Sequence, residues 1–353
     1  MSTPTTNELT NASMAFLSYV GQFSKIDQTT VFQTANSINQ LLPKYPNLNN
    51  DWEIVWGPAL YCTTAKTPNP QANLTFVARS LSSPNSYIVA TRGTVANDTW
   101  EWMTEDLATP FEPWPIPASV NSEPHVSSAT FSAVYYVLKT VPPTETPSGY
   151  SPLPGAGQTL ADYLASVAAT GKVNISFTGH SLGGAIAPAL ALWFRQAQGG
   201  VQIPSNDIFY PMPSWDANNN ASISCVSLAG ATPGDTAFSD YFGTLLGDSH
   251  DRIYNTNDVV PYGFAGLGSL SKLYLPIKMT KKETIGLAAL EKKVKSAENK
   301  NGAPYCVLPS NQPTGNPFTC ALNTASTSYS AEALYQHIAA YELQFGLPVS
   351  KGV

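Results

Sequence analysis

The sequence has little charge, no long apolar run and no closely spaced cysteines, and each absence disfavours a class of protein. Asp, Glu, Lys and Arg make up 12% of its 353 residues, about half of the ~25% typical of globular proteins. Uncharged polar residues and proline fill the difference. The net charge of −6 disfavours a nucleic-acid partner. No apolar run reaches the roughly 18 residues that a transmembrane helix needs.

The beginning of the chain lacks the pattern of a secretory leader. Residues 1–11 are polar and contain no positive region, and the apolar stretch 14–20 is too short and too interrupted for a signal peptide. A cytoplasmic protein, a leader already removed and export by another route all fit this beginning. The low-charge composition favours a secreted protein.

The cysteine spacing and the motifs indicate no metal and no cofactor. No pair among Cys62, Cys225, Cys306 and Cys320 has Cys-x-x-Cys spacing, which disfavours zinc and thioredoxin-like chemistry. Cys306 and Cys320 flank a loop rich in Pro, Asn and Gly, so a disulfide and two free thiols both fit. His-Glu-x-x-His is absent, no cluster of His, Cys and carboxylates has ligand spacing, and no glycine loop suited to phosphate appears.

Short apolar runs alternate with helical segments along the chain. Apolar residues that recur at intervals of three and four positions predict helices over residues 7–42, 129–138, 160–169 and 185–197. Short β-rich runs predict strands at 52–56, 74–78, 87–91, 173–177, 222–228 and 252–255. This alternation favours an α/β fold with a mostly parallel central sheet flanked by helices. Because no repeat or linker divides residues 1–353, we expect a single domain, and a monomer.

A Gly-x-Ser-x-Gly pentapeptide, Gly179 to Gly183, follows the predicted strand 173–177 and precedes a helix. A nucleophilic serine needs this strand–turn–helix setting, because the turn is strained and tolerates no bulky residue two positions either side of the serine. The helix dipole also stabilises negative charge that develops at Ser181. The alternative is a glycine-rich turn with a structural serine. We expect Ser181 to be a nucleophile.

Four separated motifs share features with one enzyme family. They are TGHSLGGA at 178–185, IVATRGT at 88–94, GATPGD at 230–235 with Phe238, and RIYNTNDVVP at 252–261. In these motifs the sequence resembles the class 3 lipases, the filamentous-fungal triacylglycerol lipases and their bacterial relatives. The third motif has slightly altered spacing and is weak alone. The resemblance implies the α/β-hydrolase fold with lid and cap insertions, and an enzyme that hydrolyses esters.

The serine needs a general base and a carboxylate that orients it. In α/β-hydrolases the chain order is Ser, then Asp or Glu, then His, so His125 comes too early. His250 lies too near the predicted aspartate strand to sit on a separate loop. His337 lies in the segment 331–341 with the His-x-x-x-Tyr pattern that the family's catalytic histidine often shows. We therefore predict His337 as the base.

Asp258 is predicted as the acid because it follows an apolar strand, and open α/β sheets place their sites at the carboxyl ends of strands. Asp235, which also follows a strand, is the alternative. For the oxyanion hole we expect the backbone N–H of Leu182. The resemblance implies a second donor, the backbone N–H of Thr94, with its hydroxyl as a third.

Two segments are candidates for setting the substrate. The resemblance implies a lid-like segment at about 95–115, in which Trp100, Trp102 and Met103 would meet lipid; the alternative is a buried helix with these side chains in the core. His180 is a further candidate for substrate binding, although its position beside Ser181 within the turn favours a packing role. A Lys-rich insertion at about 272–300 could cap the site, touch an anionic interface or form a solvated surface helix.

These features predict a carboxylic ester hydrolase that works through an acyl-enzyme on a lipid or ester. A lipid–water interface is one setting in which such an enzyme would act. A triacylglycerol lipase is the leading hypothesis. A short-chain carboxylesterase, a phospholipase A1 and a feruloyl-type esterase are alternatives within the same chemistry. A non-catalytic hydrolase-fold protein that binds lipid or protein is the alternative from another class.

Overall fold

The computed structural model describes residues 3–21, 29–62, 72–93, 109–116, 122–199, 215–312 and 315–348. Thr94, Trp100, Trp102 and Met103, together with most of the predicted lid-like segment, lie outside these residues. Among the described helices, none is long and apolar enough to cross a membrane.

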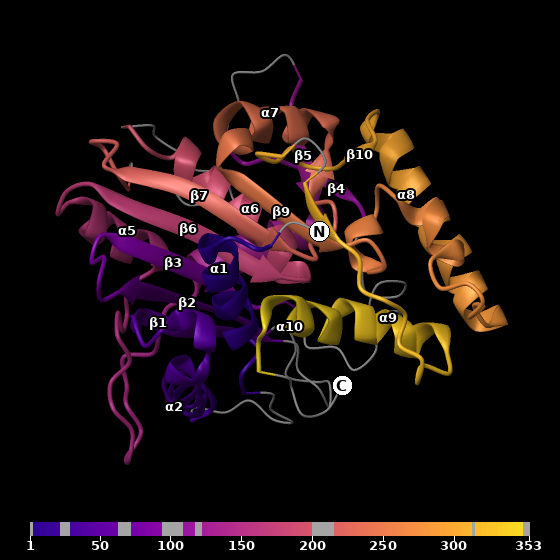
Figure 1. The fold of residues 1–353 in the computed structure, drawn as a ribbon. Helices are drawn as coiled ribbons and strands as arrows, with labels where there is room; N and C mark the ends of the chain where they lie inside the picture. The colour runs from indigo at the N-terminus through magenta and orange to yellow at the C-terminus, as the bar shows by residue number, and fades with distance from the viewer. Residues whose placement is uncertain are drawn as a thin grey trace.

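A seven-stranded sheet forms the centre of the described structure (Figure 1). Its strands, in spatial order, are β1 (Trp52–Cys62), β2 (Ala72–Ser80), β3 (Ser86–Thr91), β6 (Val173–His180), β7 (Ala221–Leu228), β9 (His250–Asn255) and β11 (Asn316–Phe318). The first three strands pair antiparallel, and every pair from β3 to β11 is parallel. The prediction of a mostly parallel sheet is confirmed.

Helices cover both faces of this sheet because its strands are apolar on both sides. On one face, side chains such as Phe76, Ile88 and Val226 pack with α1 (Thr6–Leu17) and α10 (Ala339–Phe345). On the other face, side chains such as Val89 and Phe177 pack with four helices. These are α4 (Ser128–Lys139), α5 (Leu160–Ala168), α6 (Leu182–Gln196) and α7 (Thr236–Leu246).

The helix predicted over residues 7–42 is wrong as a single element. The chain forms α1, which ends at Leu17, and α2 (Thr30–Leu41), which packs beside β1. Gly21, at φ 83°, takes a left-handed conformation that does not continue a helix. α1 and α2 are therefore two separate helices.

A second, four-stranded sheet was not predicted, because its strands are only two or three residues long. Its order is β10 (Tyr305–Cys306), β8 (Gly234–Asp235), β5 (His125–Ser127) and β4 (Phe111–Pro113). The Lys-rich segment contains α8 (Lys281–Asn301), which lies at the rim of the molecule near β10 and β4 (Figure 1). The remaining helical elements are α9 (Tyr329–His337) and short 3-10 turns at Leu42–Lys44, Pro46–Leu48, Gly247–Ser249, Val260–Tyr262 and Leu267–Lys272.

Candidate active site

Ser181 occupies a strained turn between the central strand β6 and helix α6. Its backbone has φ 62° and ψ −127°, a conformation that residues other than glycine rarely adopt. Its N–H donates to Leu228 O of β7, and its own carbonyl accepts from the N–H groups of Gly184 and Ala185. These bonds hold the serine at the carboxyl edge of the sheet and at the N-terminus of α6, as the pentapeptide predicted.

The glycines of the motif leave space for backbones to meet at this turn. A Cβ at Gly179 would lie 2.3 Å from Gly183 O, and one at Gly183 would lie 2.3 Å from Thr91 O. A Cβ at Gly93 would lie 2.9 Å from the Cβ of Ser181. The turn after β3 therefore presses directly against the serine, which explains why two separate motifs of the sequence contain glycine.

Tyr19, which the sequence analysis missed, enters the site from the end of α1. Arg92 is buried and has no ion pair with a described carboxylate. Its guanidinium donates to Ser18 O and Val20 O, both at 2.5 Å. Burial lowers the pKa of Arg92 to about 10, which leaves it protonated at neutral pH. By holding the carbonyls on both sides of Tyr19, Arg92 fixes the tyrosine beside the serine turn.

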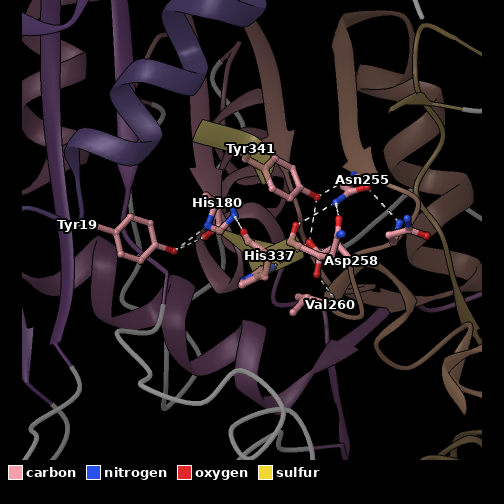
Figure 2. Close-up of polar contacts among 9 residues, drawn as sticks. Tyr19, His180, Asn255, Asp258, Val260, His337 and Tyr341 are labelled. Atoms are coloured by element: carbon pink, nitrogen blue, oxygen red, sulfur yellow. Dashed lines mark hydrogen bonds and ion pairs between the residues drawn. The ribbon is translucent and has the colours of Figure 1, made fainter. Parts of the chain in front are cut away.

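The Tyr19 hydroxyl reaches the residues around the serine (Figure 2). It lies 3.0 Å from His180 O and 3.1 Å from His180 Nδ1. Burial raises the pKa of Tyr19, an effect that Arg92, the Gly93 N–H and the Ser181 hydroxyl partly offset. Tyr19 therefore stays protonated and polar within a buried site.

His180 is a buried neutral link between Tyr19 and His337. Its Nε2 lies 2.8 Å from His337 O, and because a carbonyl only accepts, the proton must lie on Nε2. Its ring packs on the His337 ring, with centroids 4.5 Å apart. Burial, and then the nearby His337, lower the pKa of His180 well below its usual value. Both ring nitrogens are occupied by protein groups, and its predicted contact with substrate stays a prediction.

Asp258 and His337 meet although 79 positions separate them in the sequence. His337 Nδ1 lies 2.8 Å from Asp258 Oδ2, and both side chains are buried (Figure 2). Asp258 follows β9, and His337 is the last residue of α9. Since the carboxylate accepts, Nδ1 carries the proton of neutral His337, and Nε2 is left as the basic nitrogen.

Further donors hold the Asp258 carboxylate in place. Oδ1 accepts from the Val260 N–H at 3.0 Å, and Oδ2 accepts from the Tyr341 hydroxyl at 2.9 Å. The Tyr341 oxygen in turn accepts from the Asn255 N–H at 2.9 Å. Burial, and then the Asp258 charge, raise the pKa of Tyr341, so it remains a donor. The tyrosine of the His-x-x-x-Tyr pattern thus binds Asp258 rather than His337.

Asn255 joins the end of β9 to the end of α9. Its side-chain amide donates to Gln336 O at 3.0 Å and to Gln336 Oε1 at 2.6 Å. Its own oxygen accepts from the N–H groups of Asn257 and Cys320. Because Gln336 directly precedes His337, this amide fixes the backbone that carries the histidine. Residue spacing alone gave no signal for this role.

The rejected alternatives have structural roles. Asp235 caps α7 by accepting from the Phe238 N–H at 2.9 Å, and its other oxygen lies 3.3 Å from His125 Nδ1. His250 is buried and bonded to Ser227 Oγ and Pro309 O. Cys306 and Cys320, for which a disulfide and thiols both fitted, are free thiols. Within the described ranges, no group of three or more His, Cys, Asp or Glu residues could hold a metal ion.

The mostly parallel sheet, the serine at a strand-to-helix turn and the buried Asp–His pair define an α/β-hydrolase fold. The model of the family described as lipase (class 3) matches residues 88–265, about half of the chain. The chain therefore belongs to the class 3 lipase family and is a lipase, an ester hydrolase whose substrate is a lipid or another ester.

The chain is similar to solved structures of lipases. A crystal structure of M37 lipase has a TM-score of 0.78 and 25% sequence identity, covering 98% of this chain and 94% of that chain. A lipase from Rhizopus microsporus var. chinensis is also similar, with a TM-score of 0.42, 19% identity and coverage of 74% and 70%. No curated protein sequence matches the chain.

Proposed function

We propose that this lipase hydrolyses triacylglycerols through a Ser181–His337–Asp258 triad. The observation that carries the proposal is the Asp258–His337 pair, joined at 2.8 Å and packed against the residue that precedes Ser181. A buried carboxylate that fixes the Nδ1–H tautomer leaves Nε2 free to take a proton from the serine hydroxyl.

The reaction proceeds in two halves. His337 Nε2 takes the Ser181 proton while Oγ forms a bond to the ester carbonyl carbon, and Asp258 stabilises the resulting imidazolium. The imidazolium then gives its proton to the departing alcohol oxygen as the C–O bond breaks, which leaves an acyl-enzyme. Water, deprotonated by His337, attacks the acyl carbon and releases a carboxylic acid, and Ser181 regains its proton.

The negative oxygen of the tetrahedral intermediates needs hydrogen-bond donors, on the side of Ser181 away from His337. We assign this role to the backbone N–H of Leu182, the first residue of α6, where the helix dipole adds to the hydrogen bond. The backbone N–H of Thr94, and its hydroxyl, are the further proposed donors. Gly93, which directly precedes Thr94, lies against Ser181, and this neighbourhood supports the assignment.

We also propose that the enzyme acts at a lipid–water interface. The predicted lid-like segment and the polar, weakly charged composition support this proposal. Trp100, Trp102 and Met103 stay predictions as lipid-contacting residues. A secreted monomer is proposed on the same compositional ground.

The test compares initial rates on an emulsified long-chain triacylglycerol and on a soluble short-chain ester. Ser181→Ala should abolish both activities and labelling by a fluorophosphonate, because the oxygen that forms the acyl-enzyme is gone. Ser166→Ala removes an exposed hydroxyl on α5 and serves as the matched control, which should leave both rates unchanged.

Each outcome has a distinct meaning. Turnover of the emulsion that disappears in Ser181→Ala supports a triacylglycerol lipase. Turnover of the short ester alone, also lost in Ser181→Ala, would replace that substrate with a short-chain ester and keep the triad. Labelling that persists in Ser181→Ala would overturn the assignment of the nucleophile.

A further inference from the structure

One face of helix α8 borders a cavity of about 690 Å³ that lies outside the proposed triad. Its volume falls within the roughly 300–1,000 Å³ of small-molecule sites. The residues of α8 that line it recur at helical spacing, at 289, 292–293, 296–297 and 300–301. The opposite wall is the edge strand β4 and the two residues before it. A single helix face and a sheet edge thus form a cleft.

The walls of this cavity are rigid. On α8 the neighbouring stripe, Leu287, Leu290 and Val294, is buried in an apolar cluster. On β4, Phe111 stacks on Tyr305 with ring centroids 4.2 Å apart, and Tyr305 donates to Thr109 O. Both walls are therefore held by buried contacts, and the cavity is preformed.

One part of the lining is apolar. Pro110, Phe111 and Pro113 on the strand side face Ala289 and Ala297 on the helix side. The two prolines lack an N–H, so this edge of the four-stranded sheet offers few donors. Such a surface suits a hydrocarbon chain, because contact between apolar groups removes both from water.

The other part of the lining is cationic and uncompensated. Lys292, Lys293 and Lys300 line the cavity, and no described residue forms an ion pair with any of them. The described residues of the lining include no carboxylate. His125, the remaining titratable lining group, already lies 3.3 Å from Asp235 Oδ2. Three ammonium groups at one site in a chain of net charge −6 attract an anion.

We propose that this cavity binds an amphiphile that has an acyl chain and an anionic head group. The chain lies along Phe111 and the two prolines, and the head group lies among Lys292, Lys293 and Lys300. Two sources offer this chemistry: the long-chain carboxylate that ester hydrolysis releases, and an anionic phospholipid at the substrate surface. The site contains none of the proposed catalytic residues, so it does not depend on the role of Ser181.

The test measures binding of oleate to the full chain by isothermal titration calorimetry. Replacing Lys292, Lys293 and Lys300 by Gln should weaken binding about tenfold, because the anionic head group loses three exposed cationic partners. The matched control replaces Lys272, Lys278 and Lys295, which lose the same charge from the same segment but do not line the cavity. It should bind oleate as the wild type does. Ala289→Trp, which fills the cavity without changing charge, should also weaken binding.

Two further ligands and a vesicle assay identify the head group and its source. Butyrate has the charge without the chain and oleyl alcohol has the chain without the charge, so both should bind more weakly than oleate. Phosphatidylglycerol vesicles test the phospholipid: a loss of vesicle binding in the cavity triple variant, but not in the control, assigns the site to the lipid surface. The proposal is overturned if the two triple variants behave alike for both oleate and vesicles, or if oleyl alcohol binds as tightly as oleate.

Discussion

Near the proposed triad, the residues that could be predicted belong to short contiguous motifs. The residues that were missed act through contacts between distant parts of the sequence. Gly179, Ser181 and Gly183 are contiguous, and their spacing reflects the steric needs of one turn. Tyr19 contacts His180 across 161 positions, and nothing in its neighbours marks it out. A side chain that acts through a long-range contact has no local pattern, so the sequence analysis could not find it.

Tyr341 offers a test of how the acid is held. Tyr341→Phe removes one donor from Asp258 and the acceptor of the buried Asn255 N–H. An unsatisfied buried N–H costs about 1–3 kcal/mol, so the free energy of unfolding should fall by that amount. A less constrained Asp258–His337 pair should lower kcat by roughly tenfold with little change in KM.

Tyr335→Phe is the control for this change, because the Tyr335 hydroxyl contacts the Cys320 thiol and not the acid. It should leave kcat unaltered. A Tyr341→Phe enzyme with wild-type kcat would show that the Val260 and His337 donors alone position Asp258.

At the scale of elements, the strands that could be predicted from the sequence are the long, buried ones. Strands β3, β6, β7 and β9 lie in the interior of the sheet, and their apolar runs were predicted close to their observed bounds. Strands β4, β5, β8 and β10 are two or three residues long and form only through pairing with distant segments. Periodicity over so few residues cannot distinguish a strand from a loop. The continuous helix predicted over 7–42 failed because apolar spacing continued beyond a turn that contains Gly21.

For the Lys-rich segment that contains α8, the sequence left three roles open: a cap, an anionic interface and a solvated surface helix. The structure shows one buried stripe, and Leu290 lies wholly within it. Leu290→Ala should therefore lower the free energy of unfolding by about 2–5 kcal/mol through lost contacts and a cavity. Ile285 lies on the same helix and is 60% exposed. Ile285→Ala should therefore change the free energy of unfolding by no more than about 0.5 kcal/mol.

Urea unfolding followed by circular dichroism measures both α8 variants. Equal effects from the two substitutions would mean that α8 is a solvated helix, and the rigid cavity wall beside it would then have no support.

At the scale of the whole molecule, the low charge noted in the sequence has a structural counterpart in polar groups that are buried neutral. His180 and His250 are both buried, and neither ring bonds to a carboxylate of the described residues. His250 Nδ1 donates to Pro309 O, and its Nε2 accepts from the Ser227 hydroxyl. Both partners are uncharged. Burial lowers the pKa of His250 to about 4. The fold therefore favours the neutral form of both histidines, in which each ring carries a single N–H proton. Composition could not reveal this property.

Folding should consequently weaken in mild acid. Below about pH 6.5 the unfolded chain binds protons on these histidines, whereas folded His250 resists protonation until about pH 4. The unfolded state then binds more protons, so the free energy of unfolding falls as pH drops through this window. Because the pKa of His250 falls to about 4 on folding, its contribution is on the order of 3 kcal/mol, and His180 acts in the same direction. The half-buried Asp251 carboxyl, whose pKa desolvation raises, opposes the trend only at the acidic end.

Urea unfolding at pH 7, 6, 5 and 4 measures this slope, and His250→Gln isolates the contribution of one histidine. The variant loses its titrating group, so its stability should depend less steeply on pH than that of the wild type, while the remaining slope reports His180. If the two proteins lose stability in parallel between pH 6.5 and 4, His250 does not control the acid response, and the loss must come from charges elsewhere on the molecule.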